Sequence, residues 1–214
     1  MDQETEIINT NTRVEKFKTF LINNKKSLTS FIIILILILF GYFFYTDYAK
    51  KQKIKLADRY NLVQVNFNSG NKNNAANELK SIIMSKDKTY SPLALYFMID
   101  NSLIESAEEI NKFFDIIIND TDLDKEVKNL IIYKKALYNS EFETEINLLN
   151  ILKPLLNSDS VWKSHAFLLM GDFFYSKGEK QKSKEFYLKI TNLKTVNQNI
   201  LLQVQKKIRR DFDE

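Results

Sequence analysis

The chain has 214 residues, a formal net charge of +4, a single histidine and no cysteine. These totals exclude a disulfide framework, Cys/His nucleophilic pairs and ordinary zinc sites, and the small net charge lacks the dense basic stripe of a nucleic-acid-binding protein. Four glycines and two prolines are too few for a sheet protein rich in tight turns, so the composition favours long helices.

Residues 1–26 form a polar leader. Between residues 12 and 26 the apolar side chains Val14, Phe17, Phe20 and Leu21 are spaced three and four apart. This spacing predicts a short amphipathic helix near a membrane, with neighbouring lysines suited to anionic lipid. A leader that is merely frayed explains the pattern equally well.

Residues 27–46 contain no charged side chain. A helix of 20 residues is about 30 Å long, which matches the hydrocarbon core of a bilayer, so we expect one transmembrane helix here. A buried core helix is rarely apolar on every side over this length. A cleaved signal fits poorly because no small-x-small site follows. We therefore interpret the segment as a retained signal anchor, with tyrosines at its C-terminal boundary.

The orientation of this anchor is not set by charge. Lysines precede the apolar segment at 16, 18, 25 and 26 and follow it at 50, 51, 53 and 55. The positive-inside rule compares these flanks, and here they are nearly tied, with a slight bias toward a cytoplasmic C-terminus.

After residue 46 the start and stop signals of helices divide the chain. The helix that leaves the bilayer is expected to end near Gly70. Ser91 before Pro92 predicts an N-cap with proline at the first helical position, and Ser106 with Glu109 matches a capping box. Further helices are expected to start at Thr121 or Asp122, near Phe142 with Pro154 toward the end, after Ser160, at Glu179 and at Asn197.

These helices group into pairs that begin near residues 56, 91, 125 and 162. A two-helix unit that recurs about every 34 residues is the tetratricopeptide period, in which each hairpin hides its apolar stripe against its neighbour. The expected fold is all-α. A single N-terminal transmembrane helix is followed, over residues 47–214, by a tetratricopeptide-like α-solenoid of about four helical hairpins and a C-terminal capping helix.

The fourth pair resembles a tetratricopeptide repeat residue by residue. Gly171 would let two helices approach closely, with the small Ser183 facing it. Phe174 would fill the gap, Gly178 would take the turn and Tyr187 would pack onward. These five residues are the predicted packing signature; residues that bind a partner are not predicted.

The complete arrangement resembles the YfgM-like family, the ancillary subunit of the bacterial SecYEG translocon. The matching features are the anchor, the helix that runs out of it to Gly70, the Ser91-Pro92 pair and the stretch around Gly171. The resemblance implies a cytoplasmic N-terminus in the inner membrane and a periplasmic repeat domain. It also implies the SecYEG translocon and a periplasmic chaperone as partners.

The sequence offers few side chains that are suited to catalysis or to binding a cofactor. His165 lies within a helical stretch, so we expect it to be structural. Asp120, Asp122 and Asp124 alternate like calcium ligands, but Lys125 replaces the glycine that such a loop requires, and helix capping is the better interpretation. We expect no enzyme, no cofactor and no small-molecule substrate. The first hypothesis is a membrane-anchored interaction module; the alternative is a membrane-tethered regulatory or assembly scaffold with its repeats in the cytoplasm.

Overall fold

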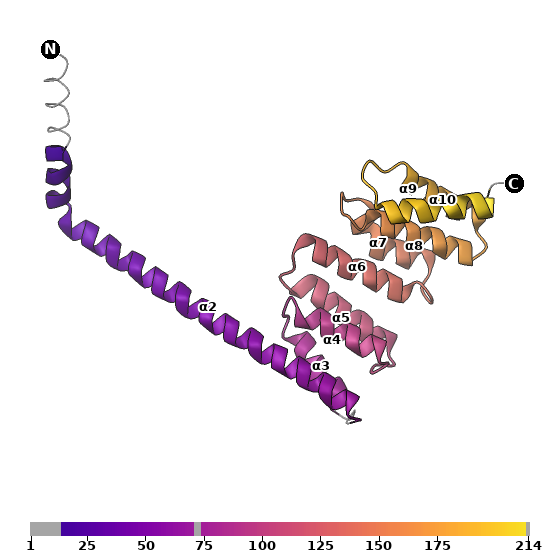
Figure 1. Cartoon of the computed structure of the whole chain (residues 1–214), viewed down its shortest axis with the longest axis horizontal. Helices are drawn as coiled ribbons and strands as arrows, with labels where there is room; N and C mark the ends of the chain where they lie inside the picture. The colour runs from indigo at the N-terminus through magenta and orange to yellow at the C-terminus, as the bar shows by residue number, and fades with distance from the viewer. Residues whose placement is uncertain (1–13, 71–73, 213–214) are drawn as a thin grey trace, which may run out of the picture. The chain divides into compact units, whose positions relative to one another are not determined.

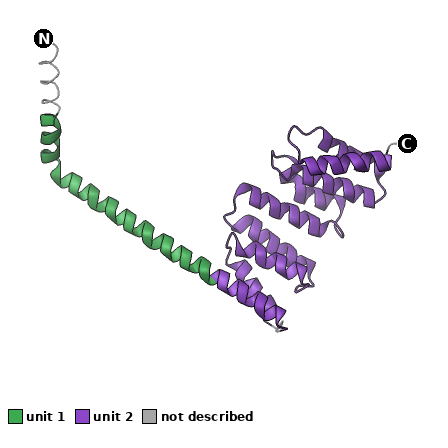
Figure 2. Ribbon diagram, in the orientation of Figure 1, with its two compact units in different colours: residues 1–55 green, residues 56–214 purple. Residues whose placement is uncertain are grey.

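The computed structural model describes residues 14–70 and 74–212, and these residues form helices and turns with no strand among them. The chain divides into two compact units, Met1–Lys55 and Leu56–Glu214 (Figure 2). The prediction of an all-α fold is confirmed.

The first unit contains a short helix over residues 14–23 and most of the long helix α2 (Lys25–Asn68). Side chains 31–40 of α2 are each between 44% and 66% exposed, so the apolar stretch is not a buried core helix. Within the described part of the chain, α2 is the one helix long and apolar enough to cross a membrane.

The second unit stacks helices in chain order, from magenta to yellow in Figure 1. The end of α2 is followed by α3 (Ala75–Met84), α4 (Tyr90–Asp100), α5 (Ala107–Asp120), α6 (Lys125–Asn139), α7 (Glu145–Leu156), α8 (Lys163–Ser176), α9 (Lys180–Thr191) and α10 (Gln198–Phe212). Each helix from α3 to α8 packs against the next one along the chain, α10 packs against α8 and α9, and the Arg59–Glu78 ion pair joins α2 to α3. Taken in chain order, the pairs are α2 with α3, α4 with α5, α6 with α7 and α8 with α9. This observed arrangement of four hairpins followed by a terminal helix agrees with the one predicted from the sequence.

Burial follows the helical period. In α3, for example, Leu79, Ile82 and Ile83 are completely buried, and their spacing of three and four places them on one face. Each such side chain stabilises the fold by about 1.5–3 kcal/mol relative to exposure. One contiguous core runs from Tyr60 of α2 to Phe174 of α8, and a smaller cluster joins α9 to α10.

The capping predictions have mixed outcomes. The Ser106 hydroxyl accepts a hydrogen bond from the Glu109 amide at 3.2 Å, so this N-cap is confirmed. The cap expected at Thr121 or Asp122 is wrong, because α6 begins only at Lys125, directly after Asp124.

The N-cap expected at Ser91 is also wrong. Helix α4 begins at Tyr90, and the Asp87 carboxylate accepts the amides of Thr89 and Tyr90, both at 2.8 Å. Ser91 is completely buried and donates instead to the Ile82 carbonyl at 3.1 Å, which ties α4 to α3. Asp87, four residues before Ser91, therefore satisfies the free amides at the actual start of the helix.

Two turns require glycine, as the sequence predicts. Gly70 and Gly178 have φ values of +89° and +79°, where a Cβ would be strained. After α8, the Gly178 amide donates to the Tyr175 carbonyl at 3.0 Å and the Glu179 amide donates to the Phe174 carbonyl at 2.9 Å. This pair of bonds is a Schellman motif, and it ends the helix where the next one must reverse direction.

The same motif ends α4 without a glycine, which makes Ser102→Gly a stabilising change. Ser102 has φ +50°, and the amides of Ser102 and Leu103 donate back to Ile99 and Met98. Relief of left-handed strain outweighs the added freedom of the unfolded chain, so we expect the free energy of unfolding to rise by about 0.5–1 kcal/mol. Urea unfolding of the full-length chain in detergent measures the change.

Ser140→Gly is the matched control for this variant. Ser140 also follows a helix, but its φ of −64° is ordinary, so glycine there can only lower stability. A stabilising effect of both variants, or of neither, would contradict the strain at Ser102.

Successive pairs are tied by hydrogen bonds across the stack. The Ser160 hydroxyl donates to the Glu126 carboxylate at 2.7 Å, and the Trp162 indole donates to the Glu126 carbonyl at 3.1 Å. The Trp162 amide donates to the Ser160 hydroxyl at 3.1 Å, as expected of a residue that opens α8. These bonds fix the start of α8 against the start of α6, which sets the spacing of the third and fourth pairs.

Candidate functional site

A groove of about 540 Å³ lies between α4 and α6, which are the first helices of the second and third pairs. Phe114 of α5 and two residues of the turn between α6 and α7 also line it. The volume is in the range that holds a few large side chains of a ligand. Its lining residues are Tyr96, Ile99, Asp100, Phe114, Lys134, Leu137, Tyr138, Glu141 and Phe142.

One side of the groove is an aromatic and aliphatic surface that reaches solvent. Tyr138 packs against Phe114 at 6.3 Å and against Phe142 at 5.4 Å between ring centroids. Leu137 is 42% exposed and Phe142 is 53% exposed. The helical period alone would assign these residues to the core, so sequence reasoning missed the surface that they form.

The charged side chains of the groove are Asp100, Glu141 and Lys134. The Lys134 ammonium lies 5.8 Å from the centre of the Tyr96 ring, a cation–π arrangement. Asp100 and Glu141 are both exposed. Two carboxylates against one ammonium leave the groove with an excess of one negative charge.

Tyr96 carries a buried hydroxyl that makes no hydrogen bond to any described residue, so we expect Tyr96→Phe to stabilise the protein. An unpaired buried hydroxyl costs about 1–3 kcal/mol, and phenylalanine keeps the ring under Lys134. The expected gain at neutral pH is therefore about 1 kcal/mol in the free energy of unfolding, measured by urea titration.

The same variant changes the response to alkali. Burial raises the pKa of Tyr96 to about 12, from 10.0 in the unfolded chain. The protonated phenol therefore contributes its full stability to the fold below pH 10, and this contribution is lost as the pH rises from 10 to 12. Tyr96→Phe removes this part of the loss, so its alkaline unfolding midpoint should lie higher. An unchanged midpoint would contradict the assignment.

A second hollow, of about 590 Å³, lies between α5, α6 and α7, and Phe142 also lines it. At its base Asn111 and Asn139 exchange two side-chain hydrogen bonds of 2.9 and 2.8 Å, and Asn139 is completely buried. The amides satisfy each other, so this hollow has a polar base. The exposed ring of Phe142 separates it from the groove.

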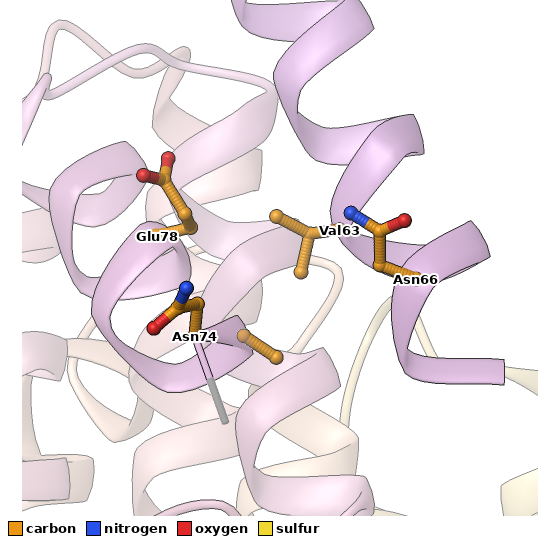
Figure 3. Close-up of a pocket in the computed structure, with 5 residues that line it drawn as sticks. Val63, Asn66, Asn74 and Glu78 are labelled. Atoms are coloured by element: carbon orange, nitrogen blue, oxygen red, sulfur yellow. The ribbon is translucent and has the colours of Figure 1, made fainter. Parts of the chain in front are cut away.

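A third hollow is much smaller. Figure 3 shows Val63 and Asn66 on α2 with Asn74, the residue before α3, and Glu78 on α3. The space is about 80 Å³, which is room for a few water molecules and not for a segment of polypeptide. Glu78, one of its lining residues, forms an ion pair of 2.8 Å with Arg59 of α2.

Three residues of the predicted packing signature meet between α8 and α9. The Ser183 hydroxyl donates to the Gly171 carbonyl at 2.8 Å, and both are buried. The Tyr187 ring lies directly against the Cα of Gly171, in the space that any side chain there would occupy. The close approach of the two helices therefore depends on glycine.

The other two signature residues lie away from this contact. Phe174 is buried and stacks on Phe186 of α9, with ring centroids 5.4 Å apart. Lys182 lies over its other side, 4.9 Å from the ring centre. Gly178 is in the turn and has open space around it.

Asp172 joins α8, α9 and α10, a role that was not predicted from the sequence. Its carboxylate accepts the Tyr187 hydroxyl and the Lys207 ammonium of α10, the latter at 2.6 Å. Burial, and then the hydrogen bond to this carboxylate, raise the pKa of Tyr187. A carboxylate beside a buried tyrosine and a lysine one helix away could have been found only with the helix pairing known.

His165 lies among aromatic rings. Trp162 is 4.8 Å away and Tyr133 is 5.6 Å away between ring centroids, and burial lowers the histidine pKa against the opposing effect of the Val161 carbonyl. Of the three alternating aspartates, Asp120 forms an ion pair with Lys86 at 3.0 Å. Within residues 14–70 and 74–212, no three His, Cys, Asp or Glu side chains gather as a metal site would need.

Comparison with known families gives one match. A family model described as a tetratricopeptide repeat-like domain matches residues 18–104. No curated protein and no solved structure matches the chain. The matched segment contains the apolar stretch of α2, the first helix pair and α4, and the pairs after residue 104 continue the same hairpin architecture. Residues 18–104 are therefore a tetratricopeptide repeat-like domain.

Proposed function

We propose that this chain is a membrane-anchored protein–protein interaction module. Residues 1–26 are its leader, residues 27–46 hold it in the bilayer, and residues 47–214 bind other polypeptides. The observation that carries the proposal is the single family match over residues 18–104, because it includes both the apolar stretch and the first repeat helices. Tetratricopeptide-like repeats bind proteins through surfaces shared by neighbouring hairpins.

The groove between α4 and α6 is the proposed contact surface. Leu137 and Phe142 expose apolar surface beside it, which is the kind of site where a partner's aromatic or aliphatic side chain becomes an anchor. Asp100 and Glu141 favour a basic residue next to that anchor. The proposed ligand is a polypeptide segment with a large apolar side chain and a lysine or arginine near it.

The finer proposal is an ancillary role at the SecYEG translocon, which rests on the resemblance to the YfgM-like family. The anchor would keep the repeat domain beside the channel and raise its effective concentration there. The groove would receive emerging chains or a periplasmic folding factor. In this role position, and not catalysis, is what the protein contributes.

Site-specific photocrosslinking in native membranes tests the groove. Leu137 in the groove and Leu188 on α9 are both leucines with 42% exposure, so a photoreactive residue at Leu188 is the matched control. We expect crosslinks to a translocon component or a folding factor from position 137 and not from 188. Equal crosslinking from both positions would refute the groove as the contact surface. Recovery of neither partner class would refute the translocon role but leave the fold intact.

A cytoplasmic repeat domain is the second candidate, because Lys50, Lys51, Lys53 and Lys55 are exposed just after the apolar stretch. The chain has no cysteine, so single cysteines report topology without background. A membrane-impermeant maleimide on intact spheroplasts should label Gln203→Cys and spare Thr19→Cys if the domain is periplasmic. The reverse result would establish the cytoplasmic scaffold.

The anchor itself is tested separately. The full-length chain should stay with washed membranes in alkaline carbonate, because residues 27–46 contribute several kcal/mol toward insertion. Release by carbonate would refute membrane anchoring in either orientation.

A further inference from the structure

The helix over residues 14–23 exposes an unusual amount of apolar surface for its length. Val14, Phe17 and Ile22 are each at least 64% exposed, and Phe20 and Leu21 are 55% and 39% exposed. Five large apolar side chains in one short helix are unfavourable in water unless something covers them.

Four of these five side chains share a face, and Ile22 projects from the other side of the helix, next to Glu15. At 100° per residue, Val14, Phe17 and Leu21 project within one third of the helix circumference, with Phe20 beside them. Glu15, Thr19 and Asn23 project from the opposite side, and Lys18 lies at the edge of the apolar face, where its ammonium can reach outward. A helix with this division fits a boundary between an apolar and an aqueous phase.

Asn24 separates this helix from α2. Its backbone amide and its side-chain amide both donate to the Phe20 carbonyl, each at 3.0 Å, and the residue itself is a turn between two helices. The preceding helix therefore need not continue along the axis of α2. Such a break is what a helix requires in order to turn from the membrane normal into the membrane plane.

The position of the break identifies what covers the apolar face. If residues 27–46 span the bilayer, as the proposed function requires, residue 23 lies within about 6 Å of the start of the span along the helix. That places it in the headgroup layer. Lys16, Lys18, Lys25 and Lys26 flank the break, and each contributes about 1 kcal/mol of attraction to an anionic surface.

From these observations we propose that residues 14–23 lie flat in the headgroup layer of an anionic membrane. Phe17, Phe20 and Leu21 face the acyl chains, and Glu15, Thr19 and Asn23 face water. The proposal rests on the membrane anchor of the proposed function but not on its orientation, because the same arrangement holds for either leaflet. The helix would fix the depth of the membrane span at its N-terminal end.

Single cysteines in the otherwise cysteine-free chain test this placement. The full-length protein carries an environment-sensitive fluorophore at Phe17→Cys or Leu21→Cys on the apolar face, or at Glu15→Cys or Thr19→Cys on the polar face. Each is reconstituted into vesicles of equal parts phosphatidylcholine and phosphatidylglycerol. Nitroxide on the upper acyl chain should quench positions 17 and 21 about threefold more strongly than positions 15 and 19.

Leu35→Cys, in the middle of the apolar stretch, separates the possible failures. Equal quenching of both faces with deep quenching at 35 overturns the interfacial helix and leaves the anchor standing. Absence of quenching at 35 overturns the anchor itself. Crosslinking between copies through position 17 that disappears on dilution with lipid would assign the apolar face to a second copy, and this too overturns the proposal.

Discussion

Gly171→Ala is expected to lower the free energy of unfolding by about 3 kcal/mol. A Cβ at this position would lie 2.5 Å from Cδ1 of Tyr187 and closer still to Cε1. The ring has nowhere to move, because Tyr187 is 1% exposed, its hydroxyl is bonded to Asp172 and its edge packs on Phe212. Overpacking therefore outweighs the helix preference of alanine over glycine, which is about 1 kcal/mol.

The measurement is urea unfolding of the full-length chain in detergent, followed by the fluorescence of Trp162. This tryptophan is the only one in the chain and lies at the start of α8. It stacks on Tyr133 with ring centroids 5.7 Å apart, so loss of the α6–α8 contact changes its surroundings.

Two controls isolate the clash. Gly178→Ala has open space around the added methyl group but a φ of +79°, so it should cost only about 1 kcal/mol of backbone strain. Tyr187→Leu removes the ring, and in that background Gly171→Ala should cost much less than in the native chain. An equal loss in both backgrounds would contradict close packing as the reason for the glycine.

The helix pairing could be predicted from the sequence because two independent signals agreed. Apolar residues recur with the helical period, and glycines at 70 and 178 mark reversals where φ is positive. The start of α4 could not be predicted so well. Ser91-Pro92 is a strong local signal, yet Asp87 can reach the free amides of that turn, and Ser91 is needed by the Ile82 carbonyl. Capping preferences depend on residues close in the sequence, so they do not predict a hydrogen bond that the serine makes to another helix.

The candidate site shows the same limit. Gly171 and Ser183 belong to a pattern within one hairpin, so their pairing could be predicted from the resemblance to a tetratricopeptide repeat, whereas Tyr187 was expected to pack onward and its ring instead lies on Gly171. The groove depends on how two hairpins stack. Leu137 and Tyr138 are adjacent in the sequence, but Tyr138 is partly buried against Phe114 of α5, whereas Leu137 is exposed at the edge of the stack. The helical period of apolar residues does not specify how neighbouring hairpins stack.

Asn139→Ala is the other change with a large expected effect, about 2–3 kcal/mol of lost stability. The Asn139 side chain is completely buried, donates to the Lys135 carbonyl at 2.7 Å and exchanges two bonds with Asn111. Alanine removes all three bonds, leaves the Asn111 side-chain carbonyl without its donor and creates a small cavity between α5 and α6, while the Asn111 amide nitrogen keeps its bond to the Ala107 carbonyl. Asn147→Ala is the matched control. The side chain of that exposed asparagine donates to nearby Glu143, its backbone amide keeps the bond to Thr144 in the variant, and the loss should stay within about 0.5–1 kcal/mol.

A double-mutant cycle decides whether the two asparagines act as a pair. Removal of one asparagine leaves the other without its hydrogen-bond partner. Replacement of both by leucine leaves no unpaired amide and adds apolar surface to the helix interface. The double variant Asn111→Leu/Asn139→Leu should therefore be more stable than the sum of the two single leucine variants predicts, by at least about 1 kcal/mol. Strict additivity would mean that each amide is satisfied independently, by water from the adjoining hollow, and that the reciprocal bonds do not hold α5 against α6.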